Sequence, residues 1–173
     1  MFDLHTLTVT HTIISLLALF AGFIIIYLQA GARRAPGFET LFIVLAVLTS
    51  ATGYLLPFEK LLPSHIVGAV ALLVLALTIV ARYAKGLAGG WLSVYGIGLV
   101  VSTWLDAFVT VAQAFAKVPA LQALAPTPNA PAFGIAQGIV LLLFVAAGVA
   151  TVKGLRRGAG AGGLPSGLSR KAA

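Results

Sequence analysis

Residues 6–29 read TLTVTHTIISLLALFAGFIIIYLQ, an uninterrupted run that contains no Asp, Glu, Lys, Arg or Pro. A helix of this length spans about 36 Å, which is enough to cross a hydrocarbon core of about 30 Å. Four more apolar runs follow, near 38–56, 64–84, 91–116 and 133–152. All eight prolines lie outside the five runs, where helices begin or end. The sequence therefore predicts an all-α transmembrane bundle with five spans.

The composition agrees with a membrane protein. Of the 173 residues, 60% are hydrophobic and 9% are charged, whereas a soluble domain carries about 25% charged residues. This balance excludes an ordinary soluble domain, a disordered chain and a nucleic-acid module. The chain has no cysteine, so disulfides and thiolate chemistry are excluded. We expect one five-helix domain over 1–157, a turn in the interface around Ala120–Leu124, and a disordered basic cytoplasmic tail over 158–173.

Basic residues are distributed unequally between the two sides of the predicted bundle. With the N-terminus outside, the inner segments carry nine of them: Arg33, Arg34, Arg82, Lys85, Lys153, Arg156, Arg157, Arg170 and Lys171. The outer segments carry only Lys60 and Lys117. Because basic residues accumulate in cytoplasmic segments, the sequence predicts an N-out, C-in orientation. The same orientation places an aromatic belt at the inner interface, made of Tyr27, Tyr83, Trp91 and Tyr95.

Polar residues within the spans gather in the predicted outer half. The fourth run has one polar stripe at spacings of three and four, formed by Ser102, Thr103, Asp106, Thr110 and Gln113. Asp106 lies roughly 12 Å deep, and a charged side chain at the centre of a span costs about 2.5–3.5 kcal/mol. The stripe should therefore face the interior of the bundle. Asp106 is either a buried acid bonded to Thr49, Thr52 or Gln137, or a residue that relays protons or binds a cation.

These positions define an expected pocket that opens outward. Its expected lining is His11, Thr49, Thr52, His65, Ser102, Asp106 and Gln137. Two histidines from different helices can ligate a haem iron from both sides, so His11 and His65 are candidate ligands of haem b, with Gly68 leaving room for the porphyrin edge. Zinc or copper would need His5 or Asp106 as a further ligand. A quinone or lipid-headgroup pocket and a plain histidine hydrogen bond are the remaining interpretations.

Two further patterns concern packing and catalysis. Residues Gly134–Gly138 form a GxxxG pattern, which allows close helix approach. In a multi-span protein this contact is usually internal, and a homo-oligomer interface is the alternative. The chain contains no phosphate-binding loop, HExxH, GxSxG or paired-carboxylate motif. We therefore expect no catalytic residue, no metal site and no nucleic-acid partner.

Three segments resemble a group of small bacterial integral membrane proteins: MFDLHTLTVTHTIISLLALFAGF (1–23), LPSHIVG (62–68) and QAFAKVPALQALAPT (113–127). The resemblance implies a bacterial inner membrane and brings no activity or functional residue with it. The chain is also similar to small b-type cytochrome bundles and ferric-reductase relatives, in having a histidine at a helix start followed by glycine.

Three functions fit these observations. The first is a non-enzymatic membrane protein that binds a small ligand or a membrane partner through the polar pocket. The second is a redox protein that holds haem b or interacts with a quinone. The third is a small proton-coupled transporter that uses Asp106.

Overall fold

The computed structural model describes residues 3–56, 63–127 and 129–161, and for residues 63–65 the backbone alone. The described chain is helical and has no strand. The elements are α1 (Leu4–Ala30), α2 (Pro36–Gly53), α3 (Pro63–Ile79) with a π-helical continuation η1 (Val80–Ala84), α4 (Trp91–Lys117), α5 (Pro119–Leu124) and α6 (Pro131–Ala161). Five helices are long and apolar enough to cross a membrane. The predicted all-α bundle with five spans is confirmed.

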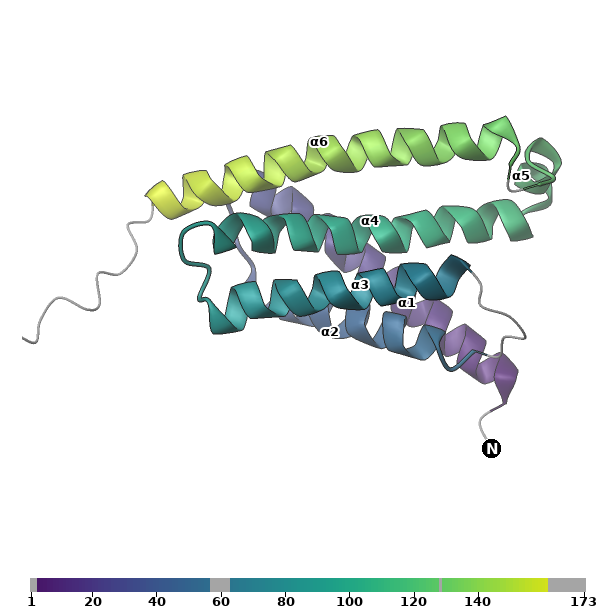
Figure 1. Cartoon of the computed structure of the whole chain (residues 1–173), viewed down its shortest axis with the longest axis horizontal. Coiled ribbons are helices and arrows are strands. Elements are labelled where there is room, and N and C mark those ends of the chain that lie inside the picture. The colour runs from purple at the N-terminus through teal and green to yellow at the C-terminus, as the bar shows by residue number, and fades with distance from the viewer. Residues whose placement is uncertain (1–2, 57–62, 128, 162–173) are drawn as a thin grey trace, which may run out of the picture.

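The five long helices alternate in direction. In Figure 1, α2, α3, α4 and α6 lie side by side in chain order, and α1 passes behind them. Contacts of α1 with α2, α4 and α6 close the bundle. One end, called here the Leu4 end, contains the start of α1 and the short helix α5. The other end, called the Ala30 end, contains the end of α1 and the end of α6.

Prolines begin several of the helices. Pro36, Pro63, Pro119 and Pro131 are the first residues of α2, α3, α5 and α6. Proline is well suited to this position because its φ angle is already helical and the missing N–H would have no partner there. The expected turn around Ala120–Leu124 is helix α5. A proline in the local sequence therefore marks the start of each of these four helices.

Helix α6 is longer than the apolar run that predicts it. The expected span ended near residue 152, whereas α6 continues to Ala161. Residues 158–161, expected in a disordered tail, are therefore helical, and residues 162–173 lie outside the described part of the chain. Hydropathy falls where the basic residues begin, but Lys, Arg, Leu and Ala all favour helix. The end of an apolar run marks a membrane boundary and not a helix end.

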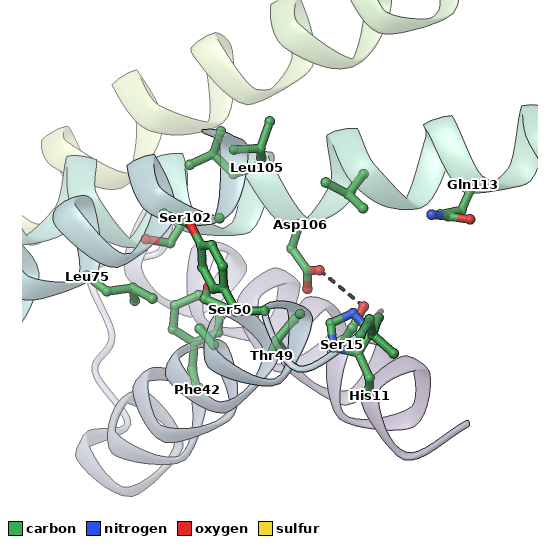
Figure 2. A pocket seen from close by; sticks show the side chains of 18 residues that line it. His11, Ser15, Phe42, Thr49, Ser50, Leu75, Ser102, Leu105, Asp106 and Gln113 are labelled. Atoms are coloured by element: carbon green, nitrogen blue, oxygen red, sulfur yellow. Dashed lines mark hydrogen bonds between the residues drawn. The ribbon is translucent and has the colours of Figure 1, made fainter. Parts of the chain in front are cut away.

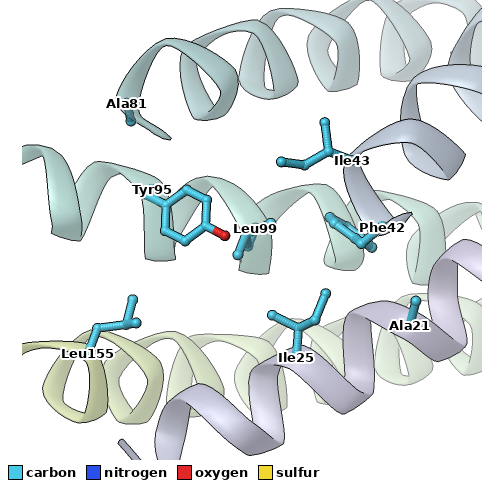
Figure 3. Packing of buried hydrophobic residues seen from close by; sticks show 8 residues of the cluster. All are labelled: Ala21, Ile25, Phe42, Ile43, Ala81, Tyr95, Leu99 and Leu155. Carbon is cyan, nitrogen blue, oxygen red and sulfur yellow. The ribbon is translucent and has the colours of Figure 1, made fainter. Parts of the chain in front are cut away.

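Large apolar side chains point away from the bundle, as a lipid environment requires. Among the most exposed are Leu73, Leu142, Phe20 and Ile66, each at least 66% exposed. The interior holds a smaller cluster, drawn in Figure 3: Ala21, Ile25, Phe42, Ile43, Ala81, Tyr95, Leu99 and Leu155. This cluster occupies the middle of the bundle and the part toward the Ala30 end.

Close helix contacts use glycines other than those expected. A Cβ atom at Gly154 of α6 would collide with the Gln29 carbonyl oxygen of α1, so these two helices touch backbone to backbone. By contrast, nothing in the described chain lies within 4 Å of a Cβ built at Gly134 or Gly138. The internal packing predicted for the GxxxG pattern is therefore wrong. Its glycines face outward because α6 contacts the bundle with a different side.

Candidate functional site

A cavity of about 160 Å³ lies among α1, α2, α3 and α4, in the half of the bundle toward the Leu4 end. Its polar lining comprises His11, Ser15, Thr49, Ser50, Tyr54, Ser102, Asp106 and Gln113, and its apolar lining includes Phe42, Ala46, Val67, Leu75, Leu105 and Val109. Figure 2 shows these side chains converging from the separate helices. At about 30 Å³ per water, the space suits a few waters or a ligand of similar size. It is smaller than the roughly 300–1,000 Å³ of sites for drug-sized molecules.

Asp106 is the charged group of this cavity and has few partners. Ser15 Oγ donates a hydrogen bond to Asp106 Oδ1 at 3.2 Å, as drawn in Figure 2. The other oxygen, Oδ2, is buried and has no hydrogen-bond partner in the described chain. The ion pairs found among the described residues both use Glu39, so no cation of the described part of the chain neutralises Asp106. A carboxylate in this position needs a proton, water or a cationic ligand, because burial of an unpaired charge is costly.

Two hydroxyl groups of the cavity also lack partners. Thr49 Oγ1 and Ser102 Oγ are buried without a hydrogen bond in the described chain, and Ser102 is only 5% exposed. Hydroxyls in helices commonly donate to the carbonyl one turn earlier, as Thr110 does to the Asp106 carbonyl oxygen. Thr49 and Ser102 do not. Both hydroxyls therefore keep hydrogen-bonding capacity that the described chain does not use.

His11 borders the cavity in a defined orientation. Its Nδ1 atom lies 2.9 Å from Thr52 Oγ1. Thr52 Oγ1 has a single hydrogen and lies 2.7 Å from the Leu48 carbonyl oxygen, to which it donates. The donor in this pair follows from the tautomer of the ring: Nδ1 of His11 donates when the Thr52 hydrogen lies on the Leu48 carbonyl oxygen. The hydrogen bond of the His11 ring therefore goes to Thr52 of α2 and not to Asp106.

The structure brings together four of the residues predicted from sequence: His11, Thr49, Ser102 and Asp106. Thr52 does not line the cavity but orients His11. Gln137 lies elsewhere and donates to the Phe108 carbonyl oxygen at 3.0 Å. The partner of Asp106 is Ser15, not Thr49, Thr52 or Gln137, because α1 lies closer to this face of α4 than sequence spacing can reveal.

The haem hypothesis depends on His65, whose side chain lies outside the described part of the chain. Gly68 was expected to leave room for a porphyrin edge. In the structure the Tyr54 ring occupies this place, since a Cβ at Gly68 would lie 3.3 Å from Tyr54 Cε2. Among the described residues, no group of three or more His, Asp or Glu side chains is arranged to hold a metal ion.

A second polar cluster, which the sequence analysis missed, lies at the Ala30 end. Glu39 is fully buried in the first turn of α2. Its Oε1 accepts hydrogen bonds from Gln29 Nε2 at 3.2 Å and from Arg34 Nε at 3.1 Å. Its Oε2 accepts from Arg34 Nη2 at 2.5 Å, from Tyr95 Oη at 2.7 Å and from Arg82 Nη1. We call these five residues the Glu39 cluster.

The Glu39 cluster joins four helical elements and the α1–α2 connection. Arg82 lies on the π-helical turn η1 and also donates to the Pro36 carbonyl oxygen at 3.0 Å. Hydrogen bonding to Glu39 raises the pKa of the Arg34 guanidinium above its ordinary value, so Arg34 remains charged. Every carboxylate oxygen is satisfied, which makes this cluster a structural connection rather than an open site.

Three expectations change in light of this cluster. Arg34 and Arg82 were interpreted as topology charges, but both are ion-paired. Tyr95 was expected in an interfacial aromatic belt, but it is fully buried, because its hydroxyl bonds to Glu39. Tyr27 and Tyr83 are exposed, as a belt requires. One sequence feature could have revealed the Glu39 cluster. Glu39 is an acid near the start of an apolar run and follows Arg33 and Arg34 closely.

Comparison with known proteins adds no further constraint: no family model, curated protein or solved structure matches the chain. The cavity and the two buried carboxylates are therefore the features of the molecule that bear on function.

Proposed function

We propose that this chain is a multi-pass membrane protein that binds a small cationic solute in the cavity, with Asp106 as the counter-charge. The observation that supports this most directly is the buried, unpartnered Oδ2 atom of Asp106. An ionisable residue inside a membrane bundle marks a functional site by default, because an unpaired charge there is costly. Glu39 shows that this fold can fully satisfy a carboxylate where structure alone requires it.

The shape and lining of the cavity favour ammonium or a small protonated amine. Thr49 Oγ1, Ser102 Oγ and Asp106 Oδ2 are three buried acceptors that have no partner among the described residues. An ammonium group carries three or more N–H donors and matches such a set. Opposite them, Phe42, Leu75 and other apolar side chains can contact a short alkyl group. The volume of about 160 Å³ limits the ligand to a few heavy atoms.

We further propose that the protein resides in a bacterial inner membrane with its N-terminus outside, so that the cavity faces outward. The unequal distribution of Lys and Arg supports this orientation, since the Leu4 end carries few basic residues. The resemblance to small bacterial membrane proteins supports the location.

A binding experiment tests the proposed ligand. Purified wild-type protein in detergent should bind radiolabelled methylammonium, and Asp106→Asn should reduce this binding at least about tenfold, the loss of one charge-assisted contact. Asp3→Asn is the matched control, because Asp3 is an exposed acid at the same end of the bundle. Equal binding by wild type and Asp106→Asn would contradict the proposal.

A proton-coupled carrier is a second candidate, favoured by a different feature of Asp106. In the described part of the chain its side-chain hydrogen bond comes from Ser15, which leaves Oδ2 without a partner there and able to exchange a proton when the ligand leaves. In liposomes containing a pH-sensitive dye, wild-type protein should couple methylammonium entry to proton movement. Binding without flux would support the simple binding protein instead.

A further inference from the structure

The outer face of α6 at the Ala30 end presents three basic side chains beside a shallow, open groove. Lys153, Arg156 and Arg157 line one part of the groove, and Ala146, Val149 and Ala150 line the rest. All six residues are exposed. This surface, called here the α6 groove, is separate from the cavity around Asp106 and has no part in the proposed ligand binding.

The position of the α6 groove along the helix matches a membrane boundary. Helix α6 has 31 residues, which corresponds to about 46 Å, whereas the hydrocarbon core is about 30 Å thick. The apolar part of the helix therefore spans the core, and the basic residues emerge at the level of the lipid headgroups. The apolar part of the groove lies one to two turns deeper, at the level of acyl chains.

The basic residues of the groove have no acidic partner in the described chain. Its acids are Asp3, Glu39 and Asp106, and of these only Glu39 lies at the Ala30 end. Glu39 is already bound to Arg34 and Arg82. The α6 groove thus concentrates positive charge that the described chain does not neutralise.

Two of the three basic side chains are held in place. Arg156 donates to Ser93 Oγ from Nε at 3.1 Å and from Nη2 at 3.0 Å. Arg157 Nη2 donates to the Ala30 carbonyl oxygen at 3.0 Å. Each guanidinium has further N–H groups available. Because these side chains are anchored, a ligand need not order them, which favours binding.

We propose that the α6 groove binds an anionic glycerophospholipid. The phosphate group contacts Lys153, Arg156 and Arg157, and one acyl chain lies along Ala146, Val149 and Ala150. Arginine and lysine are the side chains that recognise lipid phosphates at membrane surfaces. A second copy of this chain fits the groove less well, because it would bring another set of positive charges against the first.

The test uses native mass spectrometry of the full chain released from detergent, with phosphatidylglycerol or phosphatidylcholine of identical acyl chains added. We expect wild type to retain phosphatidylglycerol in preference. The double variant Lys153→Gln, Arg156→Gln should bind it roughly 30-fold more weakly, the combined attraction of two basic side chains at a membrane surface.

The matched control is Arg33→Gln, Lys85→Gln, which removes the same charge from exposed positions at the same end. Its affinity should change by less than about threefold, since charges outside the groove act through screened solvent. A third variant, Ala150→Trp, fills the apolar part and should weaken binding of the long-chain lipid while leaving all three basic side chains in place. Circular dichroism checks that each variant is folded.

Several results would overturn the proposal. Equal loss in the two double variants would mean that attraction is diffuse and the groove is not a site. Displacement of the lipid by inorganic phosphate at equal concentration would indicate a phosphate site without an acyl-chain contribution. Dimers that form in place of lipid adducts, and that the groove variants abolish, would identify a second copy as the occupant.

Discussion

Glu39 and Asp106 are both acidic residues inside the same helical bundle, yet their surroundings are opposite. Glu39, near the Ala30 end, accepts five hydrogen bonds from Gln29, Arg34, Arg82 and Tyr95. Asp106, toward the Leu4 end, accepts one side-chain hydrogen bond and lines a cavity. The apolar cluster that contains Phe42 and Leu99 connects the two regions, since Phe42 lines the cavity and Tyr95 belongs to the Glu39 cluster.

This difference shows which carboxylate has a structural role. A carboxylate with all its oxygens satisfied contributes to the fold, and its removal leaves buried cations behind. A carboxylate with an unpartnered buried oxygen costs stability, and the fold retains it at that cost. The Ala30 end is therefore the structural region and the cavity is the proposed ligand site, and four predictions test this division.

The largest expected effect is that of Glu39→Gln. The substitution preserves the shape of the side chain but leaves Arg34 and the nearly buried Arg82 without a counter-charge. Removing one partner of a buried ion pair costs roughly 3–5 kcal/mol, so we expect a loss of this order in the free energy of unfolding. Unfolding by SDS in mixed micelles measures it. If Glu39→Gln costs no more than Asp106→Asn, the division between the two carboxylates fails.

Tyr95→Phe should have the next largest effect. The Tyr95 hydroxyl donates to Glu39 Oε2 at 2.7 Å and accepts from Arg82 Nη1 at 2.8 Å. Hydrogen bonds to charged groups contribute about 1.5–3 kcal/mol, and we expect a destabilisation in this range in the same assay. Tyr27→Phe is the control and should change stability by less than about 0.5 kcal/mol, because Tyr27 lies at the same end and is 76% exposed. If both variants lose a similar amount of free energy of unfolding, the Tyr95 hydroxyl contributes no more to stability than an exposed tyrosine does.

A pair of glycine substitutions on α6 compares packing at the two ends. Gly154→Ala places a methyl group against the Gln29 carbonyl oxygen, and overpacking of this kind typically costs about 1–3 kcal/mol. Gly138→Ala meets open space and should be neutral or stabilise the helix by up to about 1 kcal/mol. Thermal unfolding in detergent distinguishes them. A destabilised Gly138→Ala would indicate that another surface packs on this part of α6.

Asp106→Asn should have the smallest effect on stability and the largest on ligand binding. The amide retains an oxygen that accepts from Ser15 and removes the need for a proton or a cation. We expect the free energy of unfolding to change by no more than about 1 kcal/mol, in either direction, while methylammonium binding is lost. If the free energy of unfolding falls by more than about 2 kcal/mol while methylammonium binding is retained, Asp106 is a structural residue like Glu39.

Several features of the site were predictable from local sequence. Residues spaced by three and four in the fourth run place Ser102, Asp106 and Gln113 on one helix face, and all three line the cavity. Others depend on distant parts of the chain. Ser15 and Asp106 are 91 positions apart, and which hydroxyl of α1 or α2 reaches the carboxylate depends on how these helices are rotated. Hydrophobic spacing does not determine that rotation when nearly all faces are apolar.

The amino-acid sequence by itself determined the five spans, the helix starts at Pro36, Pro63, Pro119 and Pro131, and the polar stripe of α4, because hydropathy, proline geometry and helical periodicity all act within one segment. Only the tertiary structure decided that Glu39 meets Arg82 and Tyr95, which lie 43 and 56 positions away. It also decided that one oxygen of Asp106 has no partner among the residues that the structure describes. Pairing of charges depends on the distances between helices, and these distances are set by close contacts such as that of Gly154 with α1. Such contacts have no periodic signature along the chain.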